Sequence, residues 1–253
     1  KMTSMGGVRS AATILTQVQK DAEKKIIEEL DQADAALSQQ IQENMFVFDN
    51  LLAVDDRGIQ ALVRLPMMQR QRDLAAGLNT AGFITGYRGS PLGSVDQTAA
   101  KARKHLEAHH VKFHPGVNED LAATSIWGTQ QVNLFPNAQY DGVFSMWYGK
   151  GPGVDRSGDV FKHANGAGTA PHGGVLVLAG DDHEAKSATI AHQSEHILKA
   201  CGIPVLYPSS VQEYLDYGLH GWAMSRYTGL WVAMKCVTDV VESGATVDID
   251  PER

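Results

Sequence analysis

Cysteine is scarce in this chain of 253 residues, which contains only Cys201 and Cys236. The two form no Cys-x-x-Cys pair, so the sequence offers no set of thiolates for a zinc ion or an iron–sulfur cluster. Isolated thiols of this kind are expected to be small, buried and reduced. Any iron–sulfur chemistry would need ligands from outside this chain.

Long apolar runs and basic clusters are also absent. No run of roughly 18 or more apolar residues occurs, and the N-terminal end lacks the basic-then-apolar pattern of a signal peptide. The net charge is −7 and no block of Lys and Arg is present, which argues against nucleic acid or an anionic membrane as a partner. We therefore expect a cytoplasmic protein with no metal site of its own.

The composition is that of a globular protein, with 43% hydrophobic and 20% charged residues. From residue 83 onward, short apolar segments alternate with helical patterns, which predicts parallel βαβ units and an α/β fold. The strands are expected at residues 83–85, 111–113, 141–148, 174–179, 203–207 and 230–237. The intervening helices are expected at residues 94–109, 119–133, from 154 onward, 187–201 and 209–226.

The N-terminal quarter has a different pattern. Residues 8–45 predict a helix, with an apolar stripe at Ile27, Leu30, Leu37 and Ile41 that Asp34 interrupts. Residues 58–78 predict a second helix, in which Pro66 favours a kink. We therefore divide the chain into an N-terminal helical extension and connection, residues 1–57, and an α/β domain, residues 58–253.

Glu119 stands where an apolar segment turns into a helix, in the sequence Val-Asn-Glu-Asp of residues 117–120. Open α/β sheets bind ligands at such turns, beyond the carboxyl ends of the strands. Two interpretations are open. Glu119 could simply follow the N-cap Asn118, where the helix dipole favours an acidic side chain. Alternatively, it could face a dry crevice, where a carboxylate can hold a proton.

A second unusual turn is Gly-Tyr-Arg-Gly-Ser-Pro-Leu-Gly at residues 86–93. Ser90 followed by Pro91 is an ordinary way to begin a helix. A helix N-terminus is also an anion site, and Arg88 lies two residues earlier. On that interpretation the Ser90 hydroxyl, free backbone N–H groups and Arg88 would hold a small carboxylate substrate.

Two further loops follow predicted strands. Residues 149–153, Gly-Lys-Gly-Pro-Gly, match neither the P-loop nor Gly-x-Gly-x-x-Gly. Here Gly151 and Gly153 either let the backbone approach a ligand or another chain, or form a plain tight turn. Asp181 and Asp182 could bind a hard cation, although capping of their own loop is favoured.

Histidine spacing allows one further interpretation, which we rank last. His192, Glu195 and His196 fit the His-x-x-Glu-His pattern of one class of zinc peptidase. That pattern needs a further carboxylate ligand downstream, and the chain has only 57 residues after His196 in which to supply it. Paired histidines on the surface of a helix explain the spacing adequately.

Several stretches together resemble the long single-chain bacterial indolepyruvate ferredoxin oxidoreductases, within the pyruvate/2-oxoacid ferredoxin oxidoreductase family. The resemblance extends over residues 58–240. It rests on residues 60–66, 76–93, 117–120, 148–156 and 181–187. In that family this region looks like the N-terminal pyrimidine-binding domain. The resemblance therefore implies a parallel-sheet thiamine-diphosphate-binding fold preceded by a helical extension.

The resemblance also implies roles for individual residues. Glu119 would contact the aminopyrimidine end of thiamine diphosphate and share a proton with its N1′ atom, with Gly151 and Gly153 beside the cofactor. Ser90 would lie near the substrate carboxylate, with Arg88 close to it. Related two-subunit enzymes carry Pro and Thr where this chain has Arg88 and Ser90, so the substrate role carries over less directly than that of Glu119.

The implied activity is oxidative decarboxylation of an arylpyruvate to an acyl-CoA, with electrons passing through iron–sulfur clusters to ferredoxin. The Gly-Asp-Gly motif that holds diphosphate and magnesium in the family is not found, nor are its cysteine clusters. We therefore expect an N-terminal fragment, inactive alone and oligomeric when complete, that needs further domains or a partner subunit. The alternative is a non-catalytic α/β module that assembles with or regulates such an enzyme. Residues 1–45 show no motif of this family.

Overall fold

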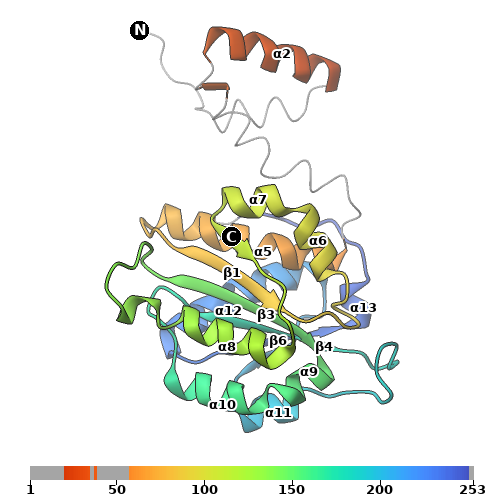
Figure 1. The fold of residues 1–253 in the computed structure, drawn as a ribbon. Helices are drawn as coiled ribbons and strands as arrows, with labels where there is room; N and C mark the ends of the chain where they lie inside the picture. The colour runs from red at the N-terminus through yellow and green to blue at the C-terminus, as the bar shows by residue number, and fades with distance from the viewer. Residues whose placement is uncertain (1–19, 35–36, 39–56, 251–253) are drawn as a thin grey trace. The chain divides into compact units, whose positions relative to one another are not determined.

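The computed structural model describes residues 20–34, 37–38 and 57–250, and it divides the chain into two units, Lys1–Asp55 and Asp56–Arg253. Figure 1 shows both units, which are described separately here. Within the described residues, no helix is long and apolar enough to cross a membrane.

The N-terminal unit contains helix α2, Lys20–Ala33. The helix stops before Asp34, whose side-chain Oδ1 accepts a hydrogen bond of 3.0 Å from the backbone N–H of Leu37. An uninterrupted helix over residues 8–45 is therefore a wrong prediction, because Asp34 caps a new turn instead of continuing the old one. Residues 8–19 and 39–45, including Ile41, lie outside the described residues.

The α/β unit is built on a six-stranded sheet in the order β2-β1-β3-β4-β6-β5. Every pair of neighbouring strands is parallel, which confirms the predicted α/β class. The strands are β1 Ala81–Gly86, β2 Val111–Phe113, β3 Val143–Lys150, β4 Val175–Asp181, β5 Val205–Leu206 and β6 Val232–Val237.

Helices cover both faces of this sheet (Figure 1). The helices on one face are α5 Gly58–Ala75, α6 Val95–Lys101, α7 Arg103–Ala108 and α12 Val211–Thr228. Those on the other are α8 Glu119–Thr129, α9 Gly151–Arg156, α10 Gly158–Ala167 and α11 Glu195–Ala200. A 3₁₀ turn, Val132–Leu134, follows α8, and the short helix α13, Thr238–Val241, follows β6.

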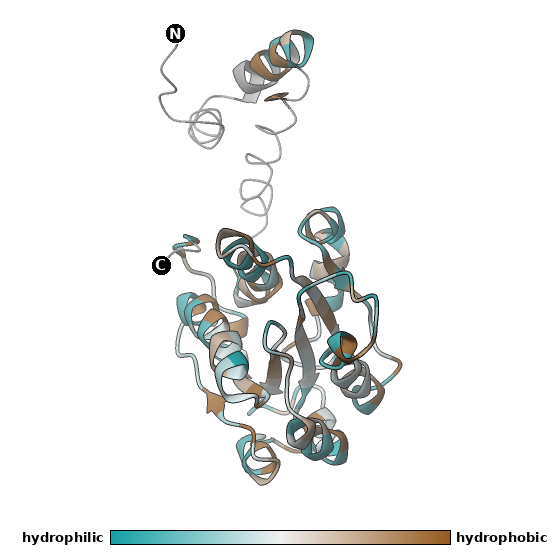
Figure 2. Cartoon of the chain, turned by 90° about the vertical axis from the view of Figure 1, so that its left-hand side faces the viewer, coloured by the Kyte–Doolittle hydropathy of each residue, from teal (hydrophilic) through white to brown (hydrophobic). Residues whose placement is uncertain are grey.

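The core lies between the sheet and these two helical layers. All seven residues of β4 are buried, as expected for a central parallel strand that is covered on both faces. On the α8–α10 side, Phe161 packs edge-on against Trp147, with ring centroids 5.1 Å apart, and lies 5.8 Å from Trp231. Figure 2 shows hydrophilic residues along the outer surfaces of the surrounding helices.

Two predicted helices differ from the structure. The segment 94–109 is broken at Ala102 into α6 and α7. In the predicted helix 187–201, only Glu195–Ala200 is helical. Residues 187–194 form instead a loop whose groups bond to other elements, as described below. Both cysteines are free and buried.

The strand order creates a switch point between β1 and β3. From β1 the chain passes to β2 through α6 and α7 on one face, and from β2 to β3 through α8 on the other. The connections diverge at this point, and in open parallel sheets ligands bind beyond the carboxyl ends of the strands at such a point. The turns that carry Ser90, Glu119 and Gly151 all follow strands at this edge.

Candidate functional site

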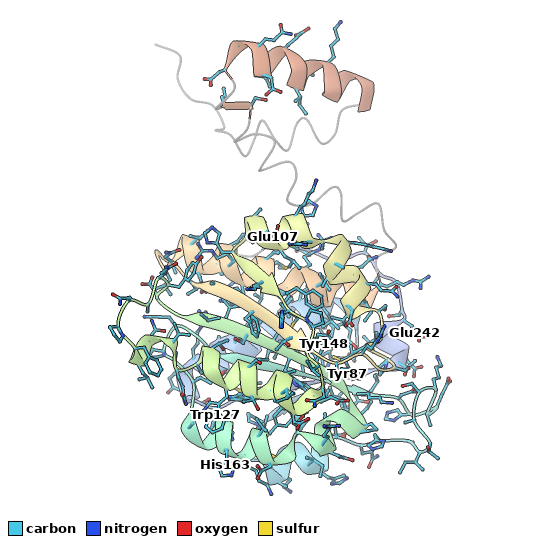
Figure 3. The ribbon with its side chains drawn as sticks, viewed as in Figure 1. Tyr87, Glu107, Trp127, Tyr148, His163 and Glu242 are labelled. Atoms are coloured by element: carbon cyan, nitrogen blue, oxygen red, sulfur yellow. The ribbon has the colours of Figure 1, made fainter. Side chains whose placement is uncertain are left out.

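Three turns converge at the carboxyl edge of the sheet. Tyr87 follows β1, and its N–H donates to the carbonyl of Tyr148 in β3, 3.0 Å away. The N–H of Gly116, in the segment that leads into α8, donates to the carbonyl of Gly86 at 2.9 Å. Figure 3 shows Tyr87 and Tyr148 close together at this end of the unit. The two unusual turns of the sequence are therefore neighbours in space.

Glu119 is the first residue of α8. The capping role belongs to Asn118, whose side-chain oxygen accepts a hydrogen bond of 2.9 Å from the N–H of Leu121. The indole N–H of Trp147 donates to the backbone carbonyl of Glu119 at 3.0 Å, which ties the start of the helix to β3. Glu119 is only 9% exposed, although it stands at a helix end. The structure therefore satisfies the capping interpretation with Asn118 and still buries the neighbouring acid.

The side chain of Glu119 lies against α9. A Cβ atom added at Gly153 would fall 2.6 Å from Cγ of Glu119, so only a glycine leaves room for this side chain. The nearby cation Arg156 pairs instead with Asp120, at 2.5 Å. Among the described residues, no group forms a hydrogen bond or ion pair with the Glu119 carboxylate. Neither oxygen is among the fully buried side-chain atoms that lack a partner, so the carboxylate keeps some contact with solvent, and its charge also attracts Arg156.

Gly151 accommodates a second side chain. A Cβ atom at this position would lie 2.3 Å from Cβ of His192. The His192 ring also lies 3.2 Å from a carboxylate oxygen of Asp155, measured from Nε2. The two glycines proposed to approach a cofactor thus accommodate, in this structure, the side chains of His192 and Glu119.

Ser90 does not begin a helix, because α6 starts at Val95 with Ser94 at the N-cap. The prediction of an ordinary helix start at Ser90 and Pro91 is therefore wrong, and the peptide bond between them is cis. The backbone N–H of Ser90 donates to Oγ of Ser187, 2.9 Å away. Arg88 is exposed and has no ion-pair partner among the described residues, so it is available to an anion.

Asp182 is almost fully buried and caps its own loop. Its carboxylate accepts hydrogen bonds from the N–H groups of Glu184, at 3.1 Å, and Lys186, at 2.7 Å. Burial tends to raise the pKa of Asp182, but the hydrogen bond from the Ser90 side chain and those from the two amides outweigh it, so the pKa is lowered. The capping interpretation of this residue is the one that the structure supports.

Asp181 anchors the other end of the same loop. Its carboxylate accepts from the N–H and the hydroxyl of Ser194, at 2.9 and 2.6 Å, and lies 3.4 Å from Nζ of Lys235. Lys235 also pairs with Glu195 at 2.5 Å. Within the described part of the chain, no group of three or more His, Cys, Asp or Glu residues is placed to hold a metal ion. Two residues of the His-x-x-Glu-His pattern have other partners: His192 contacts Asp155, and Glu195 pairs with Lys235.

Sequence reasoning missed Ser187 as a member of this site. Its Oγ accepts from the N–H of Ser90, and its carbonyl accepts a hydrogen bond from Nζ of Lys150. Ser187 was expected to lie in a helix, and a serine within a helical pattern carries no signal that it contacts residues 97 positions earlier. Only its place in the resembling stretch 181–187 set it apart.

Comparison with known proteins gives two similarities along the chain. The family described as the FliG C-terminal domain matches residues 28–82. The flagellar motor switch protein FliG of Pseudomonas aeruginosa is 50% identical over 62 residues, which are 24% of this chain and 18% of that protein. Residues 28–45 show no oxidoreductase motif, but they lie within the segment that is similar to the FliG C-terminal domain.

The second similarity covers most of the chain. The indolepyruvate oxidoreductase subunit IorA of Methanothermobacter marburgensis is 24% identical over 191 residues, which are 75% of this chain and 29% of that subunit. A solved structure of 2-oxoglutarate:ferredoxin oxidoreductase from Magnetococcus marinus matches with a TM-score of 0.55 and 14% identity. The match covers 93% of this chain and 42% of that chain, and it shows a shared fold.

These comparisons agree with the motifs at the carboxyl edge of the sheet. The chain spans less than a third of the length of the FliG and IorA relatives that it matches. Its similarity to IorA, together with the shared fold, supports a relationship with the 2-oxoacid:ferredoxin oxidoreductase family, alongside the shorter similarity to FliG at residues 28–82.

Proposed function

We propose that the α/β unit is the pyrimidine-binding part of a thiamine-diphosphate-dependent 2-oxoacid:ferredoxin oxidoreductase that acts on arylpyruvates such as indolepyruvate. One observation carries this proposal: Glu119, an acid only 9% exposed, forms no hydrogen bond or ion pair through its carboxylate with a described residue, and it lies at the switch point of a parallel sheet. The similarity to IorA over 75% of the chain supports the same assignment.

The residues present fit the aminopyrimidine end of this cofactor. A ring nitrogen that must share a proton needs a carboxyl group that is shielded from water and not already paired. Glu119 supports the second condition, since Asn118 caps α8 and Asp120 pairs with Arg156, and its exposed fraction of 9% supports the first. When bound, thiamine diphosphate supplies the carbanion chemistry and acts as the electron sink for decarboxylation.

The chain's own residues would hold and direct the proton. Glu119 would hold this proton toward the cofactor ring. The hydrogen bond from Trp147 to the Glu119 carbonyl would fix the start of α8 and thereby the position of the Glu119 side chain. Gly153 lets α9 pack directly against Glu119, which excludes water from that side. Ser90 and Arg88 would face the substrate carboxylate from the turn after β1.

Other polypeptide would supply the remaining chemistry. In this proposal, further domains or a partner subunit hold the diphosphate, magnesium and iron–sulfur clusters. Coenzyme A and ferredoxin then serve the completed, oligomeric enzyme in the cytoplasm, and the chain alone is inactive.

The test combines this chain with a polypeptide that carries the Gly-Asp-Gly motif and the cysteine clusters, and follows dye reduction that depends on indolepyruvate. Replacing Glu119 by Gln should lower turnover by about 10²–10⁴-fold, the usual contribution of a positioned acid–base group. The matched control is Glu107→Gln on α7, an exposed acid labelled in Figure 3 whose ion-pair partner among the described residues is Arg103. Turnover should be unchanged in this control.

Two results would count against the proposal. Wild-type turnover by the Glu119→Gln enzyme would show that this acid has no catalytic role. A stable complex whose activity does not depend on Glu119 would favour a non-catalytic module that assembles with or regulates the enzyme. Titration calorimetry with thiamine diphosphate distinguishes a failure to bind the cofactor from a failure of the later chemistry.

A further inference from the structure

Strand β2 forms one edge of the sheet, because β1 is its only neighbour among the described strands. The carbonyl of His110 and the N–H of His114 both bond to β1, at 3.0 and 2.9 Å. Since backbone groups alternate in direction along a strand, the N–H and C=O groups of Val111 and Phe113 point away from β1. No other described segment bonds to them. The fold thus leaves a short row of backbone donors and acceptors open to an added strand.

A groove with a volume of about 710 Å³ accompanies this edge. It is lined by α6, α7, the whole of β2 and the loop before β3. Leu106 of α7 and Val111 of β2, both almost fully buried, give the groove apolar walls. At the amino end of β2, the Tyr140 ring packs edge-on against His110, with ring centroids 5.8 Å apart. An open strand edge beside an apolar groove is what an extended peptide needs, since its backbone can pair and alternate side chains can enter the groove.

Positive charge gathers along the groove. Arg103 of α7 and Lys112 of β2 line it, and both are exposed. Lys101 and Lys104, on the same two helices, are exposed as well. Among the lining residues the single acid is Glu107, which pairs with Arg103 at 2.7 Å. In a chain with a net charge of −7, this local excess of cations favours a negatively charged partner.

A second copy of this chain fits the edge poorly. Two β2 strands paired about a two-fold axis would place the central residue of each, Lys112, opposite its counterpart. Like charges in that position destabilise a strand pair. An extended segment that carries Asp or Glu would instead meet Lys112 and Arg103 with opposite charge. The charges of the edge therefore select an acidic strand from another polypeptide.

We propose that the edge of β2 and the groove beside it bind an extended acidic segment of a partner polypeptide, which adds to the sheet as a further strand. The backbone of this segment pairs with Val111 and Phe113, and its apolar side chains enter the groove. Its carboxylates meet Arg103 and Lys112. Docking at this edge uses none of the residues assigned to the cofactor or the substrate, so it does not rest on the proposed function.

Fluorescence anisotropy tests the charge requirement on the purified chain, with a labelled, blocked peptide in which valine and glutamate alternate. This peptide should bind, and more weakly as salt is added, whereas its valine–lysine counterpart should not bind. Lys112→Glu should weaken binding about fivefold or more, the effect of replacing an exposed ion pair by a repulsion. The matched control is Lys199→Glu, the same charge change at an exposed lysine of α11 outside the groove. Its affinity should stay within about twofold of wild type.

Phe113 allows the backbone requirement to be tested separately. Phe113→Pro removes both the ring and the outward N–H, whereas Phe113→Ala removes the ring and keeps the N–H. Proline is tolerated in an edge strand where the N–H faces outward. Phe113→Pro should bind the valine–glutamate peptide about fivefold or more weakly than Phe113→Ala. Thermal unfolding checks that both variants are folded, and the Lys112→Glu comparison decides if one of them is not.

Several results would overturn docking of an acidic strand at β2. These are no binding of the valine–glutamate peptide up to about 1 mM, equal binding of the valine–lysine peptide, or equal affinities of folded Phe113→Pro and Phe113→Ala. A dimer of this chain in sedimentation experiments that is lost in Phe113→Pro would identify a second copy as the occupant instead. Glu119→Gln should bind the peptide as the wild type does, so failure of this docking site and failure of the proposed function are distinguishable.

Discussion

Two buried acids at opposite edges of the sheet differ in how they are paired. At the amino edge, Asp73 of α5 is 3% exposed and receives two bonds from Arg226, at 2.6 and 2.8 Å. It also accepts from Thr80, at 2.6 Å, and from Gln69, at 2.9 Å. At the carboxyl edge, Glu119 is 9% exposed, and its carboxylate receives no bond from the described residues.

The difference separates a structural acid from a candidate functional one. The Asp73 cluster joins α5, the segment just before β1 and α12, and each oxygen accepts hydrogen bonds, so the desolvation cost of the charge is offset. Glu119 is slightly more exposed than Asp73, and its carboxylate forms no hydrogen bond or ion pair with a described residue. Burial alone therefore does not distinguish the two acids, whereas their hydrogen-bond partners do.

The largest effect is expected from Asp73→Ala. Removing one partner of a buried pair leaves the Arg226 guanidinium uncompensated, which should lower the free energy of unfolding by about 3–5 kcal/mol in urea titrations. Arg103→Ala breaks an exposed pair with Glu107 and should cost no more than about 1 kcal/mol. Equal losses in the two variants would contradict the structural role of Asp73.

A smaller effect is expected where Glu119 meets Gly153. Gly153→Ala places a methyl group 2.6 Å from Cγ of Glu119 and should cost about 1–3 kcal/mol of unfolding free energy, as well as turnover of the assembled enzyme. At Gly128 in the same layer, an added Cβ meets nothing within 4 Å. Gly128→Ala should therefore stabilise α8 by about 0.5–1 kcal/mol. If both variants behave alike, the close packing of Glu119 on α9 is wrong.

Asp182 should contribute about 1 kcal/mol to the free energy of unfolding at neutral pH, and this contribution should depend on pH. Burial alone would raise its pKa, but its hydrogen bonds lower it below the unfolded value. Its stabilising contribution is therefore present above pH about 4 and is lost as the pH falls through the folded pKa. In thermal unfolding, the Tm of Asp182→Asn should be lower than that of the wild type at pH 7, and the difference in Tm should narrow near pH 3. A difference that widens in acid would contradict a lowered pKa for Asp182.

The smallest effect on stability is expected from Glu119→Gln. Since no described residue bonds to this carboxylate, the amide should leave the unfolding free energy within about 0.5 kcal/mol or raise it. The same change should abolish most turnover, so stability and activity separate at this residue. A large loss of stability in urea titration would make Glu119 a structural acid like Asp73.

Strand positions could be predicted because apolar periodicity is local. The apolar run at residues 174–179 predicted a buried strand, which is β4 in the structure, and the strand predicted at residues 111–113 is β2. Residues 187–194 were expected to be helical, because their intrinsic pattern does not exclude a helix. They form a loop since Ser187 bonds to Ser90 and Lys150, and Ser194 bonds to Asp181.

The candidate site was predictable only in part. Sequence motifs identified Glu119, Ser90, Arg88 and the glycines as residues that follow strands, and the parallel sheet brings their turns to one edge. No local pattern indicated that the N–H of Ser90 would donate to Oγ of Ser187, since the two are 97 positions apart in the chain. Similarly, the pairing of Asp73 with Arg226 spans 153 positions.

The order of apolar and polar residues along this chain by itself determined an alternating α/β unit, the position of Glu119 at a helix start, and two isolated thiols. Only the folded structure decided which acids are paired. The physical reason is that helix and strand preferences act between near neighbours in the sequence. Desolvation and hydrogen bonding instead depend on groups that the strand order brings together from distant parts of the chain.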